Sequence, residues 1–174
     1  MTRVFDRSLL RARLRRAAAL GPATFLIDRV AEDLADRLSA VLRQFELAVD
    51  LGSPGDAVSR VLLARPGGGR VVAAGELAAE LGLASAGRVV ANIEALPFRD
   101  ASVDLMVSGL ALQFVNDLPG TLIQVRRALK PDGLFLAALA GGDTLIELRQ
   151  AFADAEAAVD GAFEAAQHRR QTIG

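Results

Sequence analysis

An acidic residue followed by two glycines is the part of this chain best suited to hold a ligand. Asp50 ends an apolar, strand-like run, and Gly52 and Gly55 follow within five positions. Glycine has no Cβ, so a turn built from it lets the backbone approach a bound molecule closely. A helical pattern at residues 57–62 comes next, which gives the order strand, tight turn, helix. In open α/β sheets the crevice beyond such a strand is where nucleotides bind.

Other kinds of site have little support among the residues. The chain has no cysteine, which excludes disulfides, thiolate metal sites and cysteine nucleophiles. Its one histidine, His168, lies in a charged tail, where a solvated residue is more common than a catalytic base. We therefore expect no metal site and no histidine-based triad. The turn is not the dinucleotide fingerprint either, because G-x-G-x-x-G needs a third glycine where Val58 stands.

Composition predicts a globular domain of ordinary charge. The 174 residues are 52% hydrophobic and 24% charged, with a net charge of −1, which argues against a nucleic-acid partner held by bulk charge. The longest apolar stretch, residues 134–140, is shorter than the roughly 20 residues that cross a bilayer. Six arginines crowd the first sixteen residues: Arg3, Arg7, Arg11, Arg13, Arg15 and Arg16. We interpret them as the solvated face of a helix; a transit peptide or a peripheral contact with an anionic membrane are the alternatives.

Strand and helix patterns alternate along the chain, which predicts an α/β fold. Strands are expected at residues 46–51, 71–74, 88–91, 103–108 and 134–140, and helices at 23–45, 56–64, 76–82, 117–129 and from Asp143 or Thr144 to about His168. The first of these helices carries an apolar stripe at Leu26, Val30, Leu34, Leu38, Val41 and Leu42. Residues 130–133 are expected to form a turn. The pattern predicts a Rossmann-like parallel sheet of about five strands, with helices on both faces.

Three further stretches carry a family resemblance. Residues 91–98, ANIEALPF, resemble the A-D-x-x-x-L-P-F loop of class I methyltransferases that use S-adenosylmethionine. Residues 108–118, SGLALQFVNDL, are similar to the stretch after the fourth strand of that family. Residues 4–7 and 141–145 narrow the resemblance to a bacterial and mitochondrial branch related to complex I assembly factor 5. That branch is similar to the malonyl-carrier-protein methyltransferase of biotin synthesis.

The resemblance implies S-adenosylmethionine as cofactor and an α/β site that holds it. It implies cofactor contacts at Asp50, Gly52, Ser53, Gly55, Gly75, Glu76, Asn92, Ile93, Glu94, Ser108, Gly109 and Leu110. It places Gln113 and Phe114 on the substrate side. No catalytic residue is assigned, because methyl transfer from a sulfonium is a direct displacement that needs position and exclusion of water.

The chain departs from the family pattern at three of these contacts. Relatives carry an acid at the end of the second strand that holds both ribose hydroxyls, but here Gly75 stands there and Glu76 comes one residue late. Asn92 replaces the acid that bonds the adenine amino group, and Gly55 stands one residue beyond the second glycine of the family turn. We expect weakened cofactor binding, and we expect Gly75→Asp to strengthen it.

The resemblance also divides the chain and suggests its task. It predicts a basic helical segment at residues 1–45 and a methyltransferase-like domain at residues 46–174 that lacks the last two strands of the full fold. The strand at 134–140 is then a sheet edge through which copies of the chain could pair. The implied activity is methyl transfer to a protein or small-molecule acceptor. The alternative is a non-catalytic or hydroxylating assembly factor of respiratory complex I, whose partner is a subunit of that complex. The expected location is the bacterial cytoplasm, with the mitochondrial matrix as the alternative.

Overall fold

A parallel sheet organises the first part of the chain. The computed structural model describes residues 3–78 and 87–172. Its strands are β1 (Leu47–Leu51), β2 (Arg70–Gly75), β3 (Gly87–Val90), β4 (Val103–Gly109) and β5 (Leu129–Ala138). Its helices are α1 (Arg7–Leu20), α2 (Phe25–Ser39), α3 (Ala57–Ala64), the short 3-10 helix η1 (Leu112–Phe114), α4 (Leu118–Ala128) and α5 (Ile146–Thr172).

The five strands lie in the order β3-β2-β1-β4-β5 and every pair is parallel. The central strand β1 places Asp50 in register with Ala73 of β2 and Val107 of β4. Because the strands run in one direction, their carboxyl ends meet along a single edge, the edge at which α/β proteins bind ligands. This order confirms the predicted Rossmann-like parallel sheet.

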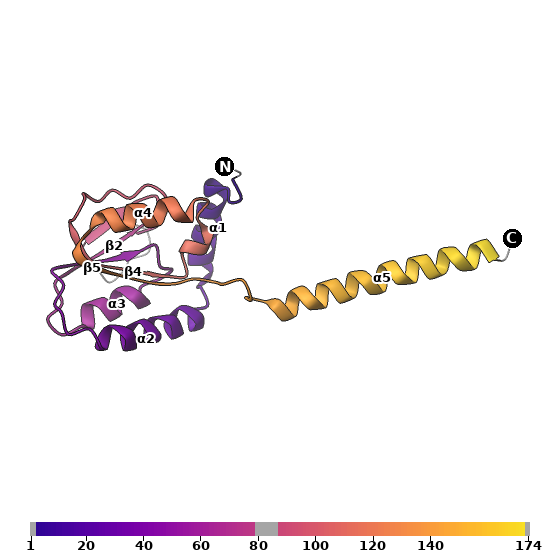
Figure 1. Cartoon of the computed structure of the whole chain (residues 1–174), viewed down its shortest axis with the longest axis horizontal. Coiled ribbons are helices and arrows are strands. Elements are labelled where there is room, and N and C mark those ends of the chain that lie inside the picture. Colours follow the sequence, from indigo (N-terminus) through magenta and orange to yellow (C-terminus); the bar gives the residue numbers. More distant parts are fainter. Residues whose placement is uncertain (1–2, 79–86, 173–174) are drawn as a thin grey trace. The chain divides into compact units, whose positions relative to one another are not determined.

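Helices cover both faces of the sheet, as predicted. Figure 1 shows α4 on one face and α2 and α3 on the opposite face. Each face has its own apolar cluster, one containing Leu34 and Val58 and the other containing Met106 and Val125. Adjacent residues of β1 divide between them, since Ala48 joins the first cluster and Val49 the second. A strand buried on both faces needs the continuous apolar run that the sequence provides.

The apolar stripe of α2 is displaced from the predicted one. The buried positions are Ile27, Ala31, Leu34 and Leu38. Leu26 is 53% exposed, and Leu42 is 95% exposed because the helix ends three residues before it. The prediction was wrong for these two leucines because neighbouring sets of apolar residues share the same helical spacing. Packing against the sheet selects the set centred on Leu34.

The other differences lie at the ends of elements. The predicted helix at 76–82 begins as a turn at Glu76–Ala78, and its remaining residues lie outside the described part of the chain. The predicted turn at 130–133 interrupts β5 itself, because Leu129 already pairs with Val103 and pairing resumes at Leu134 opposite Leu105. The last helix begins at Ile146, after a turn at residues 142–145.

The chain divides into two compact units, residues 1–139 and residues 140–174. The second unit contains α5. In the first, α2 buries side chains in the same cluster as Ala48 of β1, so the predicted division at residue 45 does not coincide with the boundary between the units. Within the described sheet β5 is an outermost strand, and self-association through its edge stays a prediction.

Candidate functional site: a cavity at the carboxyl ends of β1, β2 and β4

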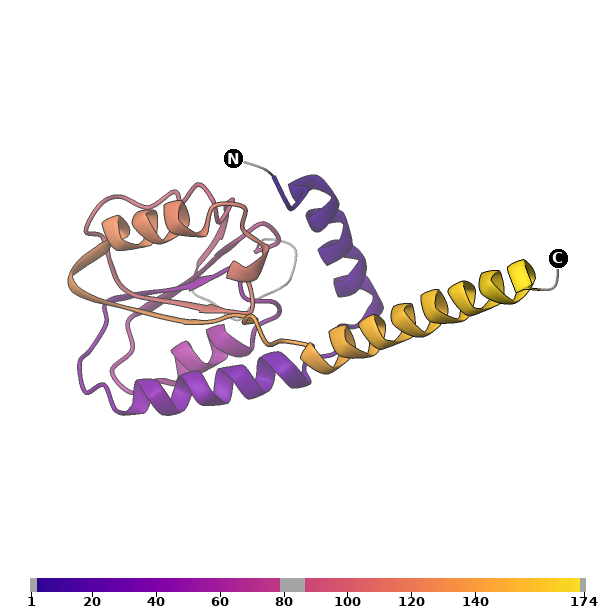
Figure 2. The same cartoon turned by 45° about the vertical axis from the view of Figure 1, so that its right-hand side comes forward.

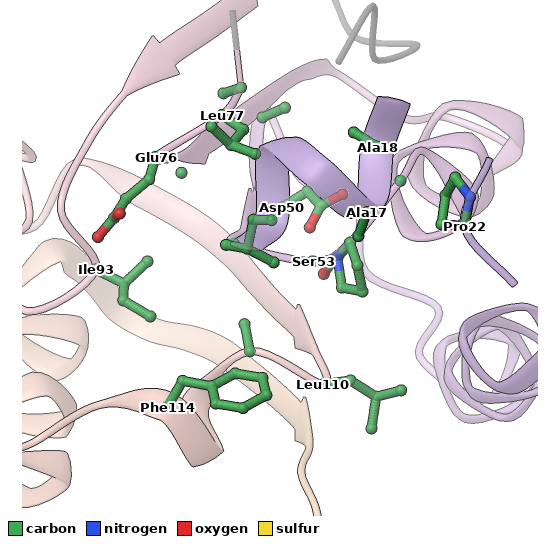
Figure 3. Close-up of a pocket in the computed structure, with 18 of the residues that line it drawn as sticks. Ala17, Ala18, Pro22, Asp50, Ser53, Glu76, Leu77, Ile93, Leu110 and Phe114 are labelled. Atoms are coloured by element: carbon green, nitrogen blue, oxygen red, sulfur yellow. The ribbon is translucent and has the colours of Figure 1, made fainter. Parts of the chain in front are cut away.

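A cavity of about 440 Å³ opens where the carboxyl ends of the central strands meet helix α1. Figure 3 shows Asp50 and Ser53 deep in it, with Glu76 and Ile93 on one side and Ala17, Ala18 and Pro22 on another. From the ends of the strands and the segments that follow them, the lining residues are Asp50, Gly52, Ser53, Pro54, Gly55, Asp56, Ala73, Ala74, Gly75, Glu76, Leu77, Ala78, Ile93, Leu110, Ala111 and Phe114. From α1 and the loop after it they are Arg7, Leu10, Leu14, Ala17, Ala18, Pro22 and Thr24.

The glycine turn after β1 needs glycine at Gly52 for two reasons. Its φ is +73°, a left-handed conformation that residues with a Cβ rarely adopt. A Cβ there would also lie 3.1 Å from Cγ2 of Ile93 and 3.2 Å from Cβ of Ala111. The N–H of Gly52 donates to the carbonyl of Ala74 at 2.8 Å, which ties the turn to β2. At Gly55, φ is +71° but the space is open, so only the backbone conformation favours glycine there.

Asp50 brings a buried carboxylate to the floor of the cavity. Its side chain accepts a 2.6 Å hydrogen bond from Oγ of Ser59 at Oδ2. The other oxygen, Oδ1, is buried and has no hydrogen-bond partner in the described residues. Burial raises the pKa of the Asp50 carboxyl, and hydrogen bonding from Ser53 and Ser59 opposes that rise. A buried acceptor without a partner is costly, so Oδ1 is an unsatisfied acceptor at the cavity floor.

Two serines near the cavity form hydrogen bonds to the main chain. Oγ of Ser53 accepts from the N–H of Gly109 at 2.8 Å, and Oγ of Ser108 donates to the carbonyl of Leu51 at 2.8 Å. These bonds hold the β1 turn against the end of β4. Ser53 still lines the cavity, whereas Ser108 and Gly109 lie behind its wall and Leu110 reaches it.

Gly75 and Glu76 lie at the end of β2, where relatives carry the acidic residue that binds ribose. A Cβ on Gly75 would lie 3.2 Å from Cα of Gly52, so β2 and the glycine turn approach closely here. The side chain of Glu76 is 7% exposed and lines the cavity. Its Oε1 contacts Arg7, and its Oε2 lies 3.3 Å from Nε of Arg11. Both carboxylate oxygens are therefore engaged by arginines of α1.

Asn92 and Glu94 are occupied by contacts within the protein and do not line the cavity. Oδ1 of Asn92 accepts from the N–H of Glu94 at 2.9 Å and from Arg7 at 3.4 Å. Oε1 of Glu94 accepts from the main-chain N–H of Asn116 at 2.6 Å and from its Nδ2 at 3.1 Å. On the predicted substrate side Phe114 lines the cavity, whereas the amide of Gln113 bonds the Leu110 carbonyl at 2.9 Å and lies outside it.

Three residues that the sequence analysis did not name as site residues contribute here. Ser59 holds Asp50, Arg7 reaches Glu76, and Asn116 binds the chain at Val4 and Phe5. Ser59 lies in the helix after the turn, where its spacing from Asp50 gave no signal. Arg7 and Asn116 both lie in stretches that resemble the family, but their partners are far away in the sequence.

The arginines near the start of the chain do not share one environment. Asp6 caps α1 by accepting from the N–H groups of Ser8 and Leu9 at 2.8 and 3.1 Å. The side chain of Arg7 is only 19% exposed because it points at Glu76, whereas Arg13 is exposed. The interpretation as a solvated face is therefore wrong for Arg7. Among the described helices none has the length and apolar character to cross a bilayer.

The parallel sheet, the glycine turn after β1 and the cavity at the strand ends define an α/β protein of the kind that binds S-adenosylmethionine or a nucleotide. The family model described as "Methyltransferase domain" matches residues 49–137. The chain belongs to this methyltransferase family.

Relatives of two kinds match the chain. It is 38% identical over 170 residues to human "Arginine-hydroxylase NDUFAF5, mitochondrial", a match that covers 92% of this chain and 48% of that protein. It is 39% identical over 125 residues to "Malonyl-[acyl-carrier protein] O-methyltransferase 1" of Coxiella burnetii, covering 72% of this chain and 44% of that one. The chain thus spans about half the length of the curated relatives it matches.

A solved structure of the same fold is phosphoethanolamine N-methyltransferase 1 of Haemonchus contortus, in complex with phosphoethanolamine and S-adenosylhomocysteine. The TM-score is 0.55 at 20% identity, over 78% of this chain and 33% of that one. This likeness supports the fold. In the described residues no group of three or more His, Cys, Asp or Glu side chains could hold a metal ion.

Proposed function

We propose that the chain binds S-adenosylmethionine in this cavity and directs its methyl group to an acceptor. The observation that carries the proposal is the free Oδ1 of the buried Asp50 beside the glycine turn. The family match supports the use of this cofactor, and a cavity of about 440 Å³ is large enough for a small-molecule ligand.

The proposal assigns a role in cofactor binding or methyl transfer to each group of residues that lines the cavity. The glycine turn allows close approach of the main chain, and Asp50 attracts a positively charged part of the cofactor. Glu76 is the acceptor for ribose hydroxyls in place of the family acid. When bound, S-adenosylmethionine supplies an activated methyl group. Ile93, Leu110 and Phe114 form an apolar wall that excludes water, which favours a direct displacement.

A second candidate is an assembly-factor role, with or without hydroxylation. It is supported by the 38% identity to the human arginine-hydroxylase across 92% of this chain. On this alternative the partner is a respiratory-complex subunit. Relatives of mitochondrial and bacterial origin support a location in the mitochondrial matrix or the bacterial cytoplasm, respectively.

Calorimetric titration with S-adenosylmethionine and S-adenosylhomocysteine tests cofactor binding. Wild-type protein should release or absorb heat and gain thermal stability. Gly52→Val should abolish both responses because it fills the space against Ile93 and forces a valine into positive φ. Gly142→Val is the matched control, since a Cβ there meets open space. The absence of both binding heat and a thermal shift in wild-type protein at millimolar ligand would contradict the proposal.

Mass spectrometry of a candidate acceptor separates the two functions. Incubation with S-adenosylmethionine labelled at the methyl group should transfer that label to the acceptor. In a parallel reaction supplied with dioxygen and a reductant, a mass gain of one oxygen atom without label would instead favour hydroxylation. An acceptor that is bound but unchanged would favour a non-catalytic assembly role.

A further inference from the structure

We propose that α1 is a hinged lid over the cavity, latched by Arg7 on Glu76, and that a ligand needing the Glu76 carboxylate must displace this latch. The identity of the ligand rests on the proposed function. The latch itself rests on contacts within the ligand-free protein.

The latch reaches three parts of the cavity rim at once. The NH2 group of Arg7 contacts Oε1 of Glu76 and lies 3.4 Å from Oδ1 of Asn92. Its NH1 group donates to the carbonyl of Phe114 at 3.2 Å. One side chain from α1 thereby joins the ends of β2 and β3 to η1.

A second anchor holds the chain just before α1. Oδ1 of Asn116 accepts from the main-chain N–H groups of Val4 and Phe5, both at 2.8 Å. Its Nδ2 donates to the carbonyl of Phe5 at 3.1 Å. The rings of Phe5 and Phe114 meet edge to face, with centroids 6.0 Å apart. The start of α1 is therefore fixed by side chains of η1 and the loop after it.

The other end of α1 has the features of a hinge. Gly21 ends the helix at a φ of +76°, in open space, and Pro22 follows it. Figure 2 shows α1 standing beside the sheet and connected to α2 through this short segment. The helix buries none of its residues, so its attachment depends on the cavity wall and on the anchors at its start. Nε of Arg7 is buried without a partner in the described residues, which reduces the net stability of the closed latch.

The latch and a ribose compete for the same atoms. A ribose diol donates two hydrogen bonds and needs carboxylate oxygens as acceptors. In the closed arrangement Oε1 of Glu76 faces Arg7 and Oε2 lies 3.3 Å from Arg11. The apparent affinity for such a ligand is reduced in proportion to the fraction of molecules that are open.

Hydrogen exchange on the ligand-free protein tests the latch without any assumption about function. Arg7→Met keeps an unbranched, flexible side chain but removes the guanidinium group and its charge, and Asn116→Ala removes the second anchor. Both should speed the exchange of the amides of α1 and leave those of β1 and β4 unchanged. Arg13→Met is the matched control, because Arg13 is exposed on the same helix and does not line the cavity. Exchange in α1 that is the same in all four proteins would overturn the latch.

Titration of the same proteins with S-adenosylhomocysteine tests the competition. Arg7→Met should bind about fivefold more tightly than wild type, and Arg13→Met should bind equally. Unchanged or weaker binding by Arg7→Met would overturn the competition, and weaker binding would make Arg7 part of the ligand site. If no variant binds, the proposed function fails, while the exchange experiment still decides whether α1 is latched.

Discussion

The polar groups at the two ends of the cavity differ in whether they already have hydrogen-bond or ion-pair partners within the protein. At the β1 end, Asp50 leaves one buried oxygen without a partner and the glycine turn presents bare main chain. At the end that follows β2, Glu76 is already bonded to Arg7, which also reaches Asn92 just outside the cavity. Under the proposed function, a ligand meets an unsatisfied acceptor at the first end, whereas at the second it has to replace contacts within the protein. A site can thus keep the family architecture while contacts within the protein occupy the polar groups at one end. The predictions below test this contrast from the largest expected effect to the smallest.

Gly75→Asp should destabilise the protein and fail to improve cofactor binding. The sequence alone suggests the opposite, since relatives carry an acid here. In the structure a Cβ at Gly75 lies 3.2 Å from Cα of Gly52, so the new side chain presses on the glycine turn. Overpacking of this kind costs about 1–3 kcal/mol. Chemical denaturation measures the loss, with Gly142→Asp as the control in open space. Tighter binding by Gly75→Asp would show that the turn yields and that the family acid can be restored.

Asp50→Asn should weaken binding of S-adenosylhomocysteine about tenfold or more. The substitution replaces a charged acceptor by a neutral amide in a buried position, which removes a charge-assisted contact to the ligand. Asp36→Asn on the exposed face of α2 is the control. Equal affinities, measured by calorimetry, would contradict the role given to the β1 end.

Ser59→Ala should lower the free energy of unfolding by about 1 kcal/mol. The serine donates the 2.6 Å hydrogen bond to Oδ2 of Asp50, and the substitution removes this partner while Oδ1 already has none among the described residues. Ser8→Ala, at an exposed position in the first turn of α1, should have little effect. Denaturant unfolding checks the difference, and a Ser59 variant as stable as wild type would mean that water replaces the hydroxyl.

The last prediction concerns pH. Burial raises the pKa of Asp50 in the folded state above its ordinary value of 3.8. Between 3.8 and that raised pKa the folded protein binds more protons than the unfolded chain, so this group's contribution to stability falls as pH rises through the window. Asp50→Asn lacks the titration. The stability of wild type relative to the variant should therefore decline from pH 3.8 upward and level off above the folded pKa. A constant difference, measured by unfolding at several pH values, would show that Asp50 is solvated.

Local patterns were enough to predict most of the fold. The apolar runs predict β1 and β4, and the glycines predict the turn after β1. Both signals lie in residues that are close together in the sequence. The stripe of α2 shows the limit. Leu26 and Ile27 are both consistent with a helix, and only packing on the sheet decides that Ile27 is buried and Leu26 is not.

By itself, the sequence determined the parallel α/β fold, the glycine turn that begins at Asp50 and the resemblance to the methyltransferase family. Tertiary structure alone decided how the polar groups around the cavity are paired. Arg7 and Glu76 are 69 positions apart, and Phe5 and Asn116 are 111 apart. No periodicity relates residues at such separations, because their contact arises when α1 folds back over the ends of strands formed later in the chain. The same packing places Gly75 against Gly52 and leaves the Asp50 oxygen free, so the chemical state of the site was set by contacts that a linear pattern does not contain.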